Sequence, residues 1–156
     1  MSIERVKSFF SGYGMEERIV EFDTSSATVE LAAEALGCDG AHIAKSMTFD
    51  AGERTILVVC AGDTKVDNSK FKTEFGVKSK MLSPELLPER VGHAMGGVCP
   101  FAINEKAEVY LDVSLKRFDT VYPACGSSNS AIGLSIDELE KYSGFIKWVD
   151  VTKPKE

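Results

Sequence analysis

The sequence predicts an α+β fold: a single compact domain, residues 1–156, with a curved, mixed and mainly antiparallel sheet flanked by short helices. Three observations support this prediction. The length of 156 residues suits one domain. Apolar residues make up 44% of the chain and charged residues 27%, which is ordinary globular usage. Helical and strand-like segments follow one another without strict alternation, which favours α+β over a parallel α/β fold.

Two helices are expected in the first 40 residues. Residues 3–13 place apolar side chains at helical spacing, and Gly14 can end that helix. Ser25 and Ser26 can cap a second helix, which the glycine at position 37 would end.

From residue 43 the apolar period changes to two, which indicates a strand. A turn over residues 50–53 leads into the β-branched run 54–61, so we expect a hairpin. Two helices are expected next, one over 71–75 capped by Asp67 or Asn68 and one starting at 83–85. Strands are expected near 108–113, 120–124 and 131–134. A helix from a capping box at 135–138 to about 142 and a last strand over 145–151 complete the chain.

The composition excludes several classes of protein. No apolar run approaches the ~20 residues that span a bilayer, and the N-terminus lacks the apolar segment of a secretion signal, so we expect a cytoplasmic protein without a membrane partner. The four cysteines and two histidines have no metal-type spacing, which predicts reduced thiols and no structural zinc site. The net charge of −6 argues against broad binding to nucleic acid, and we expect no DNA partner.

Lys45 is the most informative single residue. It has the same strand phase as the apolar residues Ile43, Met47 and Phe49, so its side chain should face the interior or a cleft. A lysine is costly to bury unpaired. Lys45 must therefore extend to solvent at the strand end, pair with an acid, or meet an anionic ligand.

Two polar or glycine-rich loops are candidates for a binding site. Gly96 and Gly97 permit unusual backbone conformations, and their amides could form a nest for the oxyanion of an ester hydrolase; a plain glycine turn is the alternative. Residues 126–130 could offer hydroxyl and amide contacts, or form an exposed hairpin loop. Cys99 could act as a nucleophile only with an activating base, for which His93 is the nearest candidate in sequence.

A local excess of lysine lies between residues 65 and 80. This stretch sums to +3 and could contact phosphates, although a lysine-rich stretch is more often a solvated helix face. The lysines in question are Lys65, Lys70, Lys72, Lys78 and Lys80.

Three blocks together resemble the YbaK/EbsC-type aminoacyl-tRNA deacylases, relatives of the editing domain of bacterial prolyl-tRNA synthetases. They are residues 37–47 around Lys45, the G-x-x-x-G-G-V-x-P-F block at 92–101, and residues 111–139 with the run Ala-Cys-Gly-Ser-Ser-Asn. The resemblance covers roughly residues 20–150. One departure is Ala102, where the family often has glycine.

The resemblance implies a trans-editing hydrolase that cleaves the ester of mischarged tRNA carrying small amino acids such as Ala, Cys, Ser or Thr. It implies a compact mixed α+β domain, no cofactor and no metal. The partner would be the acceptor end of aminoacyl-tRNA, and an aminoacyl-tRNA synthetase is a further partner that the resemblance allows. By this resemblance Lys45, Gly96 and Gly97 are the expected catalytic residues. The expected substrate-binding residues are Val98, Pro100, Phe101, Asp112, Gly126, Ser127 and Ser128.

Two other functions remain open at this point. A module of the same fold could bind tRNA or a nucleotide without catalysis. The chain could also be an interaction protein with a vestigial cleft, which the acidic net charge would suit.

Overall fold

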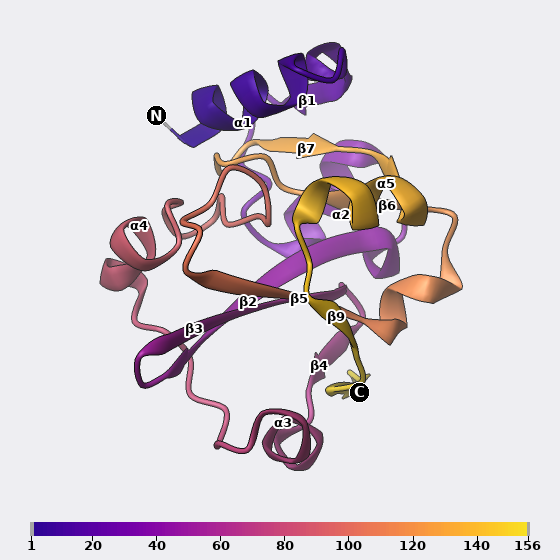
Figure 1. Cartoon of the computed structure of the whole chain (residues 1–156). Helices are drawn as coiled ribbons and strands as arrows, with labels where there is room; N and C mark the ends of the chain where they lie inside the picture. The colour runs from indigo at the N-terminus through magenta and orange to yellow at the C-terminus, as the bar shows by residue number, and fades with distance from the viewer. Residues whose placement is uncertain (1, 156) are drawn as a thin grey trace.

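A computed structural model describes residues 2–155 and is built around a six-stranded mixed sheet (Figure 1). The strand order is β8-β6-β2-β3-β5-β9. These strands are β2 (Ile43–Ala51), β3 (Arg54–Ala61), β5 (Ala107–Asp112), β6 (Thr120–Pro123), β8 (Leu134–Ser135) and β9 (Lys147–Val149). β2 and β3 form the predicted antiparallel hairpin, whereas β2 pairs with β6, β3 with β5, and β5 with β9 in parallel. The prediction of an α+β fold with a mixed sheet is confirmed.

Two small antiparallel sheets complete the strands. One pairs β1 (Ile19–Glu21) with β7 (Ser130–Ile132), and the other pairs β4 (Thr64–Val66) with β10 (Thr152–Pro154). The helices are α1 (Ser2–Ser11), α2 (Val29–Leu36), α3 (Asn68–Phe75), α4 (Leu87–Arg90) and α5 (Ile136–Ser143). Single turns of 3₁₀ helix occur at η1 (Glu16–Arg18), η2 (Gly40–His42), η3 (Pro84–Leu86) and η4 (Val113–Arg117).

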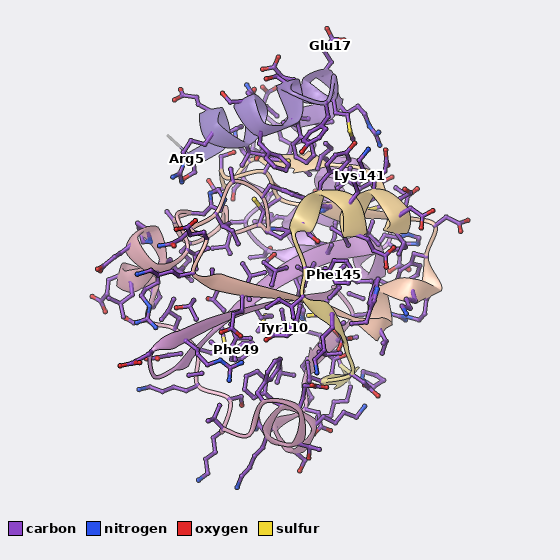
Figure 2. All side chains as sticks on the ribbon, in the orientation of Figure 1. Arg5, Glu17, Phe49, Tyr110, Lys141 and Phe145 are labelled. Atoms are coloured by element: carbon purple, nitrogen blue, oxygen red, sulfur yellow. The ribbon has the colours of Figure 1, made fainter. Side chains whose placement is uncertain are left out.

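The sheet separates two apolar clusters because strand side chains alternate between its faces. On one face, Leu57, Val59 and Leu111 pack beneath α1 and α5, which lie above the sheet in Figure 1. On the other face, Phe49 and Tyr110 lie toward α3 (Figures 1 and 2). All of β3 except Arg54 is buried, so this central strand provides a rigid base for the loops around the sheet.

Several local predictions hold because their signals are short-range. Asp67 caps α3, Gly76 ends it in the left-handed region, and Ser135 forms a capping box with Glu138 at the start of α5. The predicted cap of α2 was wrong: Thr28 caps the helix, and the hydroxyl groups of Ser25 and Ser26 instead approach the carbonyl of Ser128.

Ala102 occupies a backbone conformation that normally favours glycine. Its φ is 53°, the only positive φ of a non-glycine residue among those the structure describes. This is the position at which the resembled family often has glycine, because the left-handed region crowds the β-carbon of other residues. Among the described residues, no helix is long and apolar enough to cross a membrane.

Candidate functional site

A cavity of about 300 Å³ lies along one edge of β2. Its walls come from β2, the first part of α2, the segment before α4, the glycine loop and the β6–β7 region. Most of the lining is aliphatic, with a few polar groups among it, which is the usual character of a small-molecule site. The polar side chains in the lining are those of Ser26, Thr28, Lys45, Ser46, Thr48, Tyr122 and Ser130.

The cavity exists because β2 lacks a neighbouring strand along part of this edge. β6 pairs with β2 only at Ile43 and Ala44. Further along, the amide of Leu82 donates to the carbonyl of Thr48 at 3.1 Å. Between these points, no strand in residues 2–155 pairs with this edge of β2. Residues 45–47 therefore present both main chain and side chains to the cavity.

Lys45 lies in this gap and is half-buried. Its ammonium donates a hydrogen bond to the carbonyl of Thr64, the first residue of β4. Burial lowers the pKa of the Lys45 ammonium, and the nearby charge of Lys155 lowers it further. The side chain is thus a partly desolvated cation at the edge of the cavity, where it would interact more strongly with an anion than in bulk water.

The glycine loop supplies the opposite wall. Gly96 has a φ of 92° and lines the cavity together with Val98. Neither the Gly96 amide nor the Val98 amide donates a hydrogen bond to another residue in the described part of the chain.

Gly97 has a different place in the same loop. Its amide donates to the carbonyl of Ala94 at 3.0 Å, so in this structure that amide is already used within the turn. A β-carbon at Gly97 would lie 2.6 Å from the carbonyl carbon of Gly126. Glycine is therefore needed at position 97 for the close approach of two loops, and Gly97 is not part of the cavity lining.

The loop at 126–128 packs against the glycine loop on the side away from the cavity. The carbonyl of Ser128 accepts a hydrogen bond from the Ser26 amide at 2.6 Å, and the Ser127 hydroxyl bonds the Ser130 hydroxyl at 2.7 Å. Gly126 packs against the backbone of Ser2 and Ile3. These contacts hold the cavity wall, and residues 126–128 themselves do not line the cavity.

Three further predicted residues lie outside the cavity lining. Pro100 is buried, and Phe101 is fully buried with its ring centroid 4.9 Å from that of Phe10. Asp112 is also fully buried, at the end of β5. Its carboxylate accepts hydrogen bonds from the amide of Ser114 at 3.0 Å, the amide of Val151 at 2.9 Å and the hydroxyl of Thr152 at 2.7 Å. Asp112 therefore joins the C-terminal segment to the sheet.

The five predicted phosphate-binding lysines are divided between β4, α3 and the loop after α3. Lys65 is exposed on β4, whereas the Lys70 ammonium is bound to the Asp150 carboxylate at 3.0 Å and to the Thr152 carbonyl at 2.9 Å. Lys72 and Lys78 line a separate surface hollow beside α3. The Lys80 ammonium lies 4.0 Å from a carboxylate oxygen of Asp50.

Cys99 and His93 do meet, but not in a catalytic arrangement. The Cys99 sulfur lies 3.4 Å from Nε2 of His93, which also lies 2.7 Å from the Phe101 carbonyl. A ring nitrogen that donates to a carbonyl cannot accept the thiol proton. Burial raises the pKa of the Cys99 thiol to about 12, so the thiolate needed for attack is scarce at neutral pH.

We expect Cys99→Ala to keep amino acid release from charged tRNA within about twofold of wild type, with a stability loss of about 1 kcal/mol from the small cavity. Initial rates of release, compared at equal folded protein by circular dichroism, check this. Abolished turnover in a folded variant would restore the cysteine as a nucleophile.

Ser46 is a cavity residue that sequence analysis missed. Its hydroxyl is buried and has no hydrogen-bond partner among the described residues. The strand period placed Ser46 on the opposite face from Lys45, and periodicity alone does not reveal that β2 lacks a neighbouring strand at this point. Within residues 2–155, no group of three or more His, Cys, Asp or Glu side chains could hold a metal ion.

Comparison with known proteins shows which family the chain resembles. The sequence model of the aminoacyl-tRNA editing domain matches residues 23–142. The uncharacterized protein YwhH of Bacillus subtilis is 52% identical over the full length of both chains. A crystal structure of a candidate trans-editing enzyme for prolyl-tRNA synthetase has a TM-score of 0.87 and 27% identity, and 97% of each chain is covered.

The proline–tRNA ligase of Limosilactobacillus fermentum is 28% identical over 80% of this chain, which spans only 21% of that ligase. The family match covers most of the chain and includes every element around the β2 cavity. This chain belongs to the aminoacyl-tRNA editing domain family.

Proposed function

We propose that this protein hydrolyses the ester of mischarged aminoacyl-tRNA in trans, at the cavity along β2. One observation carries the proposal: the cavity brings the Lys45 cation, the orphaned Ser46 hydroxyl and the Gly96–Val98 segment of the glycine loop together. The family match and the similarity to a candidate trans-editing enzyme support the same activity.

The reaction that suits these groups needs no strong protein nucleophile, because an aminoacyl ester is already activated. Water, oriented by the neighbouring ribose hydroxyl, would attack the ester carbonyl. The bond between the carbonyl carbon and the ribose oxygen would break, and the amino acid and the tRNA hydroxyl would be released. Lys45 would bind the terminal phosphate or polarise the carbonyl.

The developing oxyanion would be received by the amides of Gly96 and Val98. The sequence had indicated Gly96 and Gly97, but the bond from the Gly97 amide to Ala94 favours Val98 as the second donor. Gly97 would instead act through the shape of the loop, by letting it pack against Gly126.

The cavity favours a small amino acid. Its volume of about 300 Å³ is at the low end for ligand sites, and aliphatic side chains occupy most of its wall. We propose that Ala, Cys, Ser or Thr enters and that larger side chains are excluded, as in a second-sieve editing site. The tRNA acceptor end would be the partner, with a synthetase as a further one, in the cytoplasm.

A panel of Ala-, Cys-, Ser- and Thr-charged tRNAs incubated with the pure protein tests this proposal. We expect release of at least one of these amino acids well above the spontaneous rate. Binding of tRNA without any release would instead establish the alternative, a non-catalytic tRNA-binding module of the same fold.

Ser46→Ala should lower kcat/KM for release by roughly 3- to 10-fold, the range for one lost hydrogen bond. The free energy of unfolding should stay the same or rise slightly, because the variant removes a buried hydroxyl that has no partner. Urea unfolding and initial rates measure the two effects. A fall in stability with unchanged turnover would show that the hydroxyl has a structural role only.

A further inference from the structure

The small sheet of β4 and β10 carries an arrangement of lysines that the catalytic proposal does not use. Lys65 on β4 lies directly opposite Lys153 on β10 in the antiparallel register. Their strand neighbours Thr64 and Thr152 are buried, whereas both lysines are exposed. Side chains in direct register on one face of a sheet are close neighbours, and like charges in such a pair repel. We refer to Lys65, Lys153 and the following Lys155 as the lysine ribbon.

Two of the acidic residues near the lysine ribbon form ion pairs with residues outside it. Asp63 is bound by Arg117 at 2.6 Å, and Asp150 by Lys70 at 3.0 Å. The hydrogen bond from the Lys70 amide at the cap of α3 lowers the pKa of the Asp67 carboxyl, and the nearby charge of Lys153 lowers it further without forming an ion pair. No ion pair among residues 2–155 includes a member of the lysine ribbon. The repulsion between Lys65 and Lys153 is therefore not balanced by a salt bridge, and an anion bound across the pair would relieve it.

The lysine ribbon is continuous with the cavity. Lys45 donates its hydrogen bond to the carbonyl of Thr64, the residue next to Lys65. The amide of Lys155 is bound to the carbonyl of Asp63 at 2.9 Å, which holds this residue beside the same turn. Lys155 is close enough for its charge to act on Lys45. A row of cations thus leads from the cavity edge to the outer face of β4 and β10.

We propose that the lysine ribbon binds the phosphates of the single-stranded acceptor end of tRNA while the aminoacyl ester occupies the β2 cavity. This inference rests on the proposed function. It assigns the phosphate contacts to Lys65, Lys153 and Lys155 in preference to the lysines of α3 and the loop after it. Lys70 is already neutralised by Asp150, and Lys72 and Lys78 line a separate hollow that is not part of the cavity.

The test compares two double variants that remove the same charge. Lys65→Gln/Lys153→Gln changes the lysine ribbon, and Lys72→Gln/Lys78→Gln is the matched control. The probe is a fluorescent acceptor-stem minihelix that ends in CCA and carries no amino acid. Its binding constant is measured by fluorescence anisotropy between 25 and 200 mM salt. Lys65→Arg/Lys153→Arg, which keeps both charges, serves as the rescue.

The ribbon variant should bind about tenfold more weakly at the lowest salt. A plot of the logarithm of the association constant against the logarithm of the salt concentration has a negative slope. For the ribbon variant this slope should be shallower by about 1.4, since each single-strand phosphate contact contributes about 0.7. The control and the arginine variant should stay close to wild type. Equal losses in the two glutamine variants, no loss in the ribbon variant, or no binding by wild type would each overturn the inference.

A second readout separates this inference from the proposed function. On an aminoacylated minihelix the ribbon variant should lose kcat/KM by about tenfold, whereas on an aminoacyl-adenosine, which lacks these phosphates, it should match wild type. If wild type releases no amino acid from either compound, the proposed function fails. The salt dependence of binding to the minihelix without an amino acid still tests the ribbon inference.

Discussion

Replacing Lys45 with alanine should lower kcat/KM for amino acid release from a cognate charged tRNA by on the order of 10²-fold, the scale for losing one group that stabilises a developing charge. Lys45 is the only lysine in the cavity lining, and its partial burial strengthens its interaction with an anion. Initial rates of release measure the effect.

The fold should survive this change. Among the described residues, the Lys45 ammonium bonds only the Thr64 carbonyl, and removing a half-buried cation also removes a desolvation cost. Lys72→Ala is the matched control, because it removes an exposed lysine that lies outside both the cavity and the lysine ribbon. On the same charged tRNA the control should be unaffected. Wild-type rates for Lys45→Ala would remove this residue from the mechanism.

Replacing Asp112 with alanine should lower the free energy of unfolding by about 3 kcal/mol. The change leaves the buried Val151 amide and Thr152 hydroxyl without an acceptor, and each unsatisfied buried group costs about 1–3 kcal/mol. Urea unfolding followed by circular dichroism measures the loss.

Asp63→Ala is the matched control for this prediction. The Asp63 carboxylate pairs with Arg117 at the surface, where an ion pair contributes about 0–1 kcal/mol to stability. The urea midpoint of unfolding should therefore change little. An unchanged midpoint for Asp112→Ala together with lost turnover on an aminoacyl-adenosine would instead assign Asp112 to the substrate, as the family resemblance suggested.

The elements that the sequence predicted well are those with local signals. The hairpin over 43–61, the α3 cap at Asp67 and the capping box at Ser135 each depend on residues a few positions apart. β1, β4 and β10 were missed because each has three residues and is defined by a partner far along the chain. Such pairing depends on the tertiary structure and cannot be predicted from a local sequence pattern.

The candidate site was predictable in part for the same reason. The phase of Lys45 predicted a side chain that faces the interior or a cleft, and the structure shows it half-buried in the cavity lining. The open edge of β2 depends on where β6 stops pairing, which no feature of residues 43–47 reveals, so Ser46 was overlooked. The lysine ribbon likewise requires the pairing of residue 65 with residue 153.

The most direct test of the cavity as the editing site is a crystal structure with a non-hydrolysable aminoacyl-adenosine, in which an amide replaces the ester. We predict that the aminoacyl group lies along β2, with its carbonyl oxygen within hydrogen-bond distance of the Gly96 or Val98 amide and the Lys45 side chain beside the nucleotide. An analogue bound instead in the hollow beside Trp148, or one whose carbonyl faces away from the glycine loop, would contradict the account.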